Sequence, residues 1–238
     1  MSSALSITNL SKHYGSHKIL SDINLEITEG EFFGLVGING AGKTTLIKCL
    51  LDFTEVDSGS IAIFGKQHTA NQSRRNLSFL PEKFVPPYYL SAKDFLVYMH
   101  ELHGSDYDQE KVDELLRTLD FDPVNIDKSV GQLSKGMSQK IGLAACLLSG
   151  KELLLLDEPM SGLDPRARAY LKKYLLERKE EGKTLFFSTH MLNDVEALCD
   201  KVAILHGGEI RFAGSPAQCC RDYKTNDFEQ AYLACVGD

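Results

Sequence analysis

The sequence predicts an α/β fold with a mixed parallel sheet, an N-terminal antiparallel β-subdomain and an inserted α-helical subdomain. Three observations support this fold. The apolar run 32–36 leads into a glycine-rich stretch and then a helical pattern, as in a strand, a loop and a helix packed on a sheet. The continuous apolar run 153–156 is typical of a strand buried on both faces, and 184–188, with the apolar residues 185–187, reads as another buried strand. The middle of the chain, about 82–150, carries helical spacing instead.

The glycine-rich stretch is GINGAGKTT, residues 37–45. Its glycines and the Lys43–Thr44 pair satisfy G-x-x-x-x-G-K-[ST], the pattern of a phosphate-binding P-loop. Glycine allows a tight turn with inward N–H groups, where a Cβ would obstruct a phosphate, and the next helix adds the positive end of its dipole. We predict a nucleoside triphosphate site in which Lys43 reaches the β- and γ-phosphates and Thr44 binds Mg²⁺. The alternative is a glycine-rich turn with an incidental lysine. The loop residues predicted to contact the nucleotide are Asn39, Gly40, Ala41, Gly42, Lys43, Thr44 and Thr45.

Composition limits the other classes of function. The net charge of −7 and the pI near 5.5 argue against a constitutive nucleic-acid binder, which normally has a basic face. The cysteines show neither C-x-x-C spacing nor a matched histidine pair, so no zinc site is expected. No secretory signal is visible at the N-terminus, and the longest apolar run, 141–148, is too short to cross a bilayer. We therefore expect a soluble protein of a reducing compartment, with any membrane role supplied by a partner.

The N-terminal part predicts short strands. Residues 5–10 and 19–27 alternate apolar and polar side chains, as in a half-exposed antiparallel sheet, with a turn at 13–15 between them. After the P-loop helix, a turn at 57–59 is expected to precede a strand over 60–65. A further strand, 77–80, is stopped by Pro81.

The middle predicts helices. Ser91 and Asp94 have capping-box spacing and open an amphipathic helix that extends to about 103. A second helix is expected over 108–119, and a third contains the apolar run 141–148. We expect one domain over 1–238, with 1–81 and 151–238 as the core and β-subdomain and 82–150 as the helical subdomain.

The last third returns to a strand–helix alternation. Asp164 followed by Pro165 predicts an N-cap and a first helical position. The remaining elements are expected as strands over 153–156 and 184–188, helices over 165–180 and 191–199, a hairpin over 202–205 and 209–213, and one last helix beginning at 215–216.

Two acids follow the buried run 153–156, at the edge where α/β sheets bind ligands. Asp157 suits Mg²⁺ binding opposite Thr44, and Glu158 suits a general base that polarises a water for attack on the γ-phosphate. The alternative is an acidic pair that caps a loop.

Two weaker features point to the same chemistry. Ser134 and Gly136, at the start of a helix, form a second possible anion site, although such a serine is more often an ordinary N-cap. His190 follows a buried strand and is placed to touch a γ-phosphate, although a lone histidine at a strand end is usually structural.

In their order, these motifs resemble the ATP-binding subunit of ABC transporters over nearly the whole chain. The P-loop matches Walker A, and Tyr14 lies where that family stacks an aromatic ring on adenine. The other matching motifs are FLPE (79–82) at the Q-loop, the signature LSKGM (133–137), Walker B LLLLDEP (153–159), the D-loop SGLD (161–164) and the switch histidine in STH (188–190).

The resemblance implies two cassettes that close head to tail around two Mg²⁺-ATP. Ser134, Gly136 and Met137 of each signature would then bind the γ-phosphate held by the other chain. It also implies catalysis by Glu158 and His190 with Lys43, and a separate integral-membrane permease. The cassette would be peripheral, at the cytoplasmic face of the inner membrane.

The chain departs from the family pattern at three positions. Glu82 stands where the Q-loop has glutamine, which places a charge on the Mg²⁺ side, and Lys135 and Met137 replace the commonest glycine and glutamine. Lys135 either adds a cation near the partner's phosphate or is simply solvated. The LPE and LSKGM pair looks like the ABC-2-type exporter branch.

The alternative function is a soluble ABC ATPase acting on ribosomes or DNA. Such proteins usually carry two cassettes in one chain or a cassette split by a coiled coil, whereas this cassette is single and uninterrupted. A P-loop kinase or GTPase has no use for the signature, D-loop and histidine together.

Overall fold

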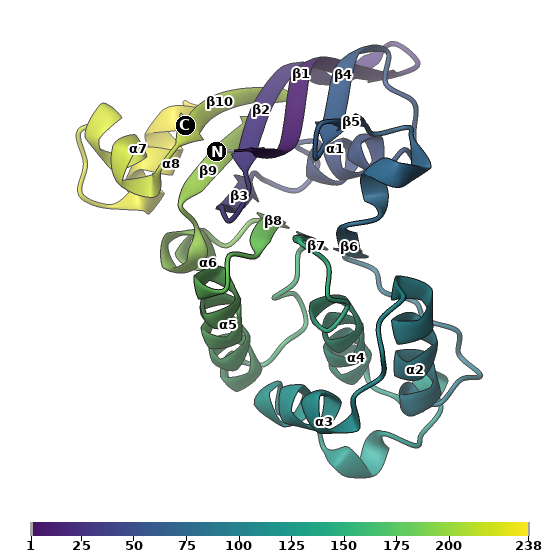
Figure 1. The fold of residues 1–238 in the computed structure, drawn as a ribbon. Helices are drawn as coiled ribbons and strands as arrows, with labels where there is room; N and C mark the ends of the chain where they lie inside the picture. Colours follow the sequence, from purple (N-terminus) through teal and green to yellow (C-terminus); the bar gives the residue numbers. More distant parts are fainter. Residues whose placement is uncertain (1, 238) are drawn as a thin grey trace.

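A six-stranded sheet forms the centre of the protein (Figure 1). The computed structural model describes residues 2–237. Neighbouring strands follow the order β10-β9-β3-β8-β7-β6, in which all pairs are parallel except β9 with β10. The expected mixed parallel sheet is therefore confirmed. Its strands are β3 (Phe32–Val36), β6 (Leu77–Leu80), β7 (Leu153–Asp157), β8 (Thr184–Thr189), β9 (Lys201–His206) and β10 (Glu209–Gly214).

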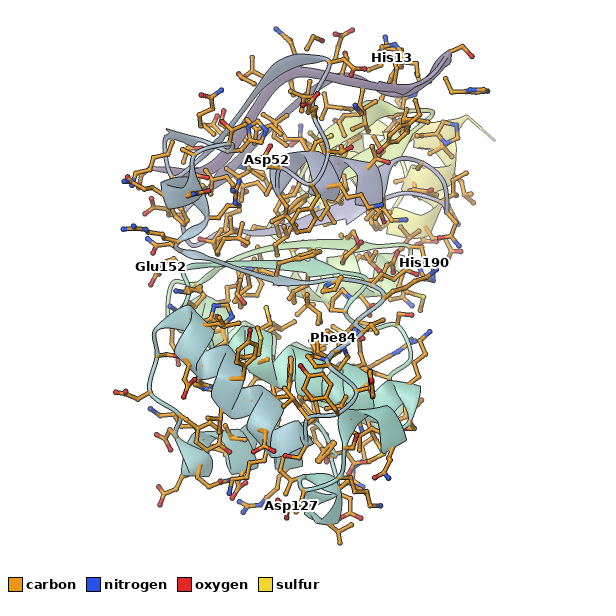
Figure 2. The ribbon with its side chains drawn as sticks, turned by 90° about the vertical axis from the view of Figure 1, so that its right-hand side faces the viewer. His13, Asp52, Phe84, Asp127, Glu152 and His190 are labelled. Carbon is orange, nitrogen blue, oxygen red and sulfur yellow. The ribbon has the colours of Figure 1, made fainter. Side chains whose placement is uncertain are left out.

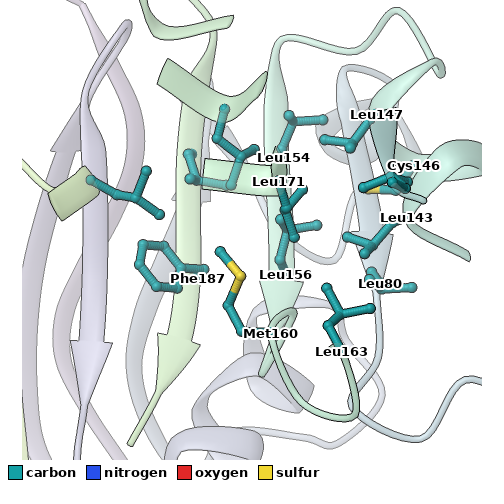
Figure 3. Close-up of a cluster of buried hydrophobic side chains, with 14 of the residues drawn as sticks. Leu80, Leu143, Cys146, Leu147, Leu154, Leu156, Met160, Leu163, Leu171 and Phe187 are labelled. Carbon is teal, nitrogen blue, oxygen red and sulfur yellow. The ribbon is translucent and has the colours of Figure 1, made fainter. Parts of the chain in front are cut away.

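This sheet is buried on both faces, as the continuous apolar runs predict. Leu153 and Leu155 point into one hydrophobic cluster, and Leu154 and Leu156 into another. The alternation follows from the two-residue period of a strand. Figure 3 shows the second cluster, in which Leu154 and Leu156 lie among side chains of the neighbouring strands and helices.

The first cluster lies between the central sheet and a four-stranded antiparallel sheet. That second sheet has the order β2-β1-β4-β5, and α1 packs its apolar side chains into the same cluster. The predicted N-terminal β-subdomain is confirmed. Its elements are β1 (Ser3–Tyr14), β2 (His17–Thr28), β4 (Ser58–Ile63) and β5 (Lys66–Gln67), with α1 over Lys43–Leu50.

Two turns differ from the sequence prediction. His13 and Tyr14 belong to β1, because Tyr14 still pairs with His17 across the hairpin; the turn itself is at 15–16. The strand expected over 60–65 is β4, which begins and ends two residues earlier. Phe64 and Gly65 have φ of +47° and +71° and form the two-residue turn into β5, since tight hairpins favour positive φ at both central positions.

The inserted helices pack on the face of the central sheet away from β1 and β2 (Figure 1). Ser91 accepts the amide hydrogen of Asp94 at 3.0 Å and caps the first of them, as its spacing predicts. The helices are α2 (Ala92–His103), α3 (Gln109–Thr118) and α4 (Lys135–Leu147). Short 3-10 helices span Asn71–Arg74, Pro123–Asn125 and Val130–Gln132.

The C-terminal part contains α5 (Pro165–Glu180) and α6 (Leu192–Leu198) close to the predicted bounds. Asp164 accepts the amide hydrogen of Ala167 at 2.9 Å, which confirms it as the N-cap of α5. The expectation of one last helix is wrong: α7 (Pro216–Asp222) is followed by α8 (Phe228–Val236). Lys224 interrupts the helix with φ of +56°, and Asp227 caps the new one.

None of the helices within 2–237 combines the length and the apolar character needed to span a membrane.

The core packing of β7 gives a stability prediction. Leu155 has no exposed surface, so Leu155→Ala should lower the free energy of unfolding by about 2–5 kcal/mol through lost burial and a residual cavity. The matched control is Leu102→Ala in α2, where the side chain is 61% exposed and the change should stay within about 0.5 kcal/mol. Urea unfolding of both variants checks this; equal losses would contradict the burial of Leu155 in the cluster between the two sheets.

Candidate functional site

Three strands bring the predicted site residues to one edge of the central sheet. β3, β7 and β8 are parallel, with Val36 opposite Thr189 and Asp157 opposite Ser188. Their carboxyl ends therefore meet, and so do the segments that follow them. In Figure 2, Glu152 before β7 and His190 after β8 mark opposite ends of this sheet. The candidate site lies at the His190 end.

Protein packing, rather than ligand space, accounts for two loop glycines. A Cβ on Gly37 would lie 2.5 Å from the carbonyl oxygen of Leu205 in β9. A Cβ on Gly42 would lie 2.9 Å from Leu20 Cδ2, and Gly42 also has φ of +111° at the N-cap of α1. The backbone carbonyl close to Gly37 and the left-handed φ of Gly42 require glycine before any nucleotide is considered. The sequence prediction explained these glycines by the space that a phosphate needs. At Gly37 and Gly42 the fold of the protein already requires glycine without a phosphate.

Lys43 lies inside the loop. Only 6% of the residue is exposed, and its Nζ donates to the carbonyl oxygens of Gly37 at 2.6 Å and Ile38 at 3.4 Å. The same Nζ is 3.5 Å from Glu158 Oε1. The loop carbonyls and one acid thus hold the ammonium group at the base of the loop.

Asp157 is buried between two hydroxyl groups. Thr44 Oγ1 donates to Asp157 Oδ2 at 3.2 Å, and Ser188 Oγ donates to Asp157 Oδ1. Burial raises the pKa of the Asp157 carboxyl, and the two hydroxyl hydrogen bonds lower it in part. The nearby charges of Glu82 and Glu158 raise that pKa further. The acid therefore lies where a bound cation would be favourable.

Glu158 has an unusual backbone and a side chain aimed at the same place. Its φ is +51°, uncommon for a residue other than glycine. Oε2 accepts a hydrogen bond from Nδ1 of His190 at 2.9 Å when that nitrogen is protonated. Oε1 is buried without a hydrogen-bond partner in the described part of the chain. One carboxylate oxygen is thus held by histidine, and the other accepts no hydrogen bond from the described residues but is ion-paired with Lys43 Nζ at 3.5 Å.

These groups face a pocket of about 530 Å³. We call it the edge pocket. It brings together most of the predicted site residues, from Tyr14 to His190. It is lined by Tyr14, Ile19, Ile38, Asn39, Gly40, Gly42, Lys43, Thr44, Thr45, Glu82, Glu158, Ser161 and His190.

Several predicted residues lie outside this lining. Ala41 is buried under the loop, and Asp157 lies behind Thr44. The signature residues Ser134, Gly136 and Met137 do not line the edge pocket either. Ser134 instead accepts the amide hydrogen of Met137 at 3.2 Å as the N-cap of α4.

The sequence prediction did not include three lining residues. Ile38 lies inside GINGAGKTT and Ser161 opens SGLD, so both stood next to a motif. Ile19 gave no signal, because it reads as one more apolar residue of a strand.

The oxygen atoms near Thr44 suit Mg²⁺. Across residues 2–237, no three or more His, Cys, Asp or Glu side chains form a metal cluster. Mg²⁺ does not need one, since it is usually held by one or two carboxylates, substrate phosphates and waters. The Thr44 hydroxyl and the raised pKa of Asp157 fit this pattern, with Glu82 as a further carboxylate in the edge pocket.

The family model described as ABC transporter matches residues 20–161, which is more than half of the chain. The chain belongs to the ABC transporter family. A solved structure described as the ATP binding subunit of an ABC transporter is 28% identical and superposes with a TM-score of 0.88. The match covers 98% of this chain and 99% of that chain.

Curated relatives agree with this family. An ABC transporter ATP-binding protein of Synechocystis is 39% identical over 84% of this chain and 57% of its own length. The bacitracin transport ATP-binding protein BcrA of Bacillus licheniformis is 36% identical over 88% of this chain and 69% of its own length. The lantibiotic transport ATP-binding protein SrtF of Streptococcus pyogenes is 37% identical, with 87% and 88% covered. The chain thus spans a little over half of the Synechocystis relative.

The Gly37 contact predicts a specific loss of stability in this ABC protein. Gly37→Ala forces a Cβ against a backbone carbonyl and should lower the free energy of unfolding by about 2–3 kcal/mol. Gly104→Ala is the control, because that Cβ meets nothing within 4 Å and only the left-handed φ of +70° costs energy, about 1 kcal/mol. Urea denaturation compares them, and a smaller loss for Gly37→Ala would argue against the close approach to β9.

Proposed function

We propose that the chain binds and hydrolyses ATP as the energy-supplying subunit of an ABC exporter, together with a separate membrane permease. The observation that carries this proposal is the edge pocket, where Lys43, the Thr44–Asp157 pair and the Glu158–His190 pair meet at one sheet edge. The names of the bacitracin and lantibiotic transport relatives support a transport role. The export direction rests on the resemblance of LPE (80–82) and LSKGM (133–137) to the ABC-2-type exporter branch.

The P-loop would hold the triphosphate. The N-terminus of α1, which begins at Lys43, would offer unpaired amide groups and the positive end of the helix dipole to the phosphates, and Lys43 would exchange part of its carbonyl contacts for phosphate oxygens. Thr44, Asp157 and Glu82 would hold Mg²⁺, whose chemistry in such a site is to neutralise charge on the β- and γ-phosphates. Tyr14 is 47% exposed at the pocket rim, as an aromatic ring that stacks on adenine must be.

Glu158 would act as the general base. Its Oε1 accepts no hydrogen bond within residues 2–237 but is 3.5 Å from Lys43 Nζ. Once Lys43 turns to the phosphates, Oε1 would be available to accept a proton from an attacking water, while His190 orients the carboxylate through Oε2. His190 also lines the edge pocket, and its side chain is half exposed, so it would be able to contact a γ-phosphate bound there. The proposed proton acceptor, Oε1, and the oxygen bonded to His190, Oε2, are thus different atoms of the Glu158 carboxylate.

A second copy of this chain would complete the site. The signature residues lie outside their own edge pocket, and a Cβ on Gly136 would lie 3.0 Å from the carbonyl oxygen of Gly162. We propose that Ser134, Gly136 and Met137 instead contact the γ-phosphate bound by a partner copy. ATP would then join two copies, and hydrolysis would release them.

The permease would be contacted from the helical side. Glu82 lines the edge pocket and begins the segment 82–150, which we propose as the helical subdomain. A cassette held this way would be peripheral, at the cytoplasmic face of the inner membrane.

The hydrolytic role predicts different losses for two variants. Glu158→Gln should bind ATP and accumulate as a dimer while steady-state hydrolysis falls by at least about a hundredfold, because only the proton acceptor is neutralised. Lys43→Ala should weaken ATP binding itself through loss of phosphate contacts. Equilibrium nucleotide binding, phosphate release and size-exclusion chromatography measure all three properties. Full turnover by Glu158→Gln would place the base elsewhere.

The transport role predicts a membrane partner. When the tagged protein is purified from detergent-solubilised membranes of its native host, a polytopic membrane protein should accompany it in stoichiometric amount. Recovery only from the soluble fraction, together with ribosomes or DNA-repair proteins, would contradict the transport role and favour a non-transport ABC ATPase. The Lys43→Ala variant serves as the control for recovery that does not depend on nucleotide.

A further inference from the structure

Ser188 contacts both acids of the edge pocket through one hydroxyl group. It lies in β8, has no exposed surface and stands opposite Asp157 in the parallel register. Its Oγ donates to Asp157 Oδ1 and accepts the amide hydrogen of Glu158 at 3.1 Å. In the sequence, Ser188 is only the last residue of the predicted strand 184–188 and the first residue of STH. The structure places it behind the pocket, where it touches no pocket space itself.

The bond to Glu158 acts on a strained backbone. A φ of +51° is unfavourable for a glutamate and persists only where surrounding contacts hold it. The amide hydrogen of Glu158 is shared between the carbonyl oxygen of Ser188, at 3.2 Å, and its Oγ, at 3.1 Å. Both acceptors of this amide therefore belong to one residue. The direction in which the Glu158 side chain leaves β7 depends on this peptide.

The bond to Asp157 fixes the rotation of a carboxylate. Ser188 occupies Oδ1, which leaves Oδ2 for the Thr44 hydroxyl at 3.2 Å. A serine hydroxyl has one hydrogen and two lone pairs, so it can donate to Asp157 and accept from Glu158 at once. Alanine can do neither, and a cysteine thiol does both weakly.

We propose that Ser188 is a positioning residue for the ATP hydrolysis proposed above, on which this inference rests. Its hydroxyl sets the Asp157 carboxylate toward Thr44 and holds the Glu158 peptide in its left-handed conformation. Both acids of the reaction are thereby aligned by one group that contacts neither the nucleotide nor the attacking water. Its loss should impair the chemical step and the use of Mg²⁺ more than the binding of ATP.

The test compares Ser188→Ala, Ser188→Thr and Ser188→Cys with Ser78→Ala in the full-length chain. Ser78 is the matched control, since it is also a strand serine, lies in β6 beside β7 and is 2% exposed. Thermal unfolding reports the structural cost of each change. Steady-state hydrolysis gives kcat and KM for ATP, and a titration of Mg²⁺ against binding of a fluorescent ATP analogue needs no turnover.

Ser188→Ala should lower kcat about tenfold or more, raise the half-saturating Mg²⁺ concentration several-fold, and change KM for ATP by less than about twofold. Ser78→Ala should leave all three within about twofold, whatever it does to the unfolding temperature. Ser188→Thr keeps the hydroxyl and should recover kcat to within about threefold of wild type. If the added methyl lowers the unfolding temperature of Ser188→Thr, the test relies on Ser188→Cys instead. Cysteine is close to serine in size but a weak hydrogen-bonding group, so its kcat should be as low as that of Ser188→Ala.

Wild-type turnover by Ser188→Cys, or losses in Ser188→Ala no larger than those in Ser78→Ala, would overturn the positioning role. A wild-type chain that hydrolyses no ATP would overturn the proposed function instead. In that case the Mg²⁺ titration still tests the role of Ser188. An unchanged half-saturating Mg²⁺ concentration in Ser188→Ala would show that the Ser188 hydroxyl does not orient the Asp157 carboxylate.

Discussion

The parallel pairing of β3, β7 and β8 is the constraint on which the site depends. Because Val36 is level with Thr189, and Asp157 with Ser188, three segments distant in sequence end at the same edge. A one-residue slip of a strand would exchange its two faces and move a carboxylate into a hydrophobic cluster. The register is well specified because both faces are apolar: alternate residues of β7 belong to different clusters. Core packing therefore also fixes the geometry of the site.

That geometry gathers more negative than positive charge at a buried edge. Asp157 and Glu158 are both buried, Glu82 lines the same pocket, and Lys43 is the buried cation among them. Desolvation and the neighbouring acids raise the pKa of Asp157, so the arrangement carries an electrostatic cost in the absence of a ligand. A divalent cation would reduce this cost by its own charge, and a triphosphate would in turn be attracted by that cation. The strained φ of Glu158 is a separate, conformational cost at the same edge of the sheet.

Features that depend on local sequence were predictable, and features that depend on distant contacts were not. The P-loop spacing, the buried strands and the caps at Ser91 and Asp164 each follow from a few adjacent residues, and the fold class followed from their order. The reason for glycine at 37 lies in β9, which the local pattern does not contain. The second C-terminal helix depends on one left-handed residue, Lys224, which has no special sequence signature. The hydroxyl of Ser188 is informative only once β8 lies beside β7.

The segment from Ser161 to Asp164 physically links the edge pocket to the signature helix of the same chain. Ser161 lines the pocket. A Cβ on Gly136 would lie 3.0 Å from the carbonyl oxygen of Gly162, so the two backbones are close together. Asp164 accepts a hydrogen bond from Lys140 Nζ at 3.5 Å. Lys140 is 7% exposed and also donates to the carbonyl oxygen of Asp120, at 2.8 Å, between α3 and the signature helix α4. Packed contacts of this kind shift between discrete arrangements rather than bend continuously. A ligand that displaces Ser161 would therefore also displace the contacts at Gly136 and Lys140. The position of the start of α4 is in this way coupled to the edge pocket.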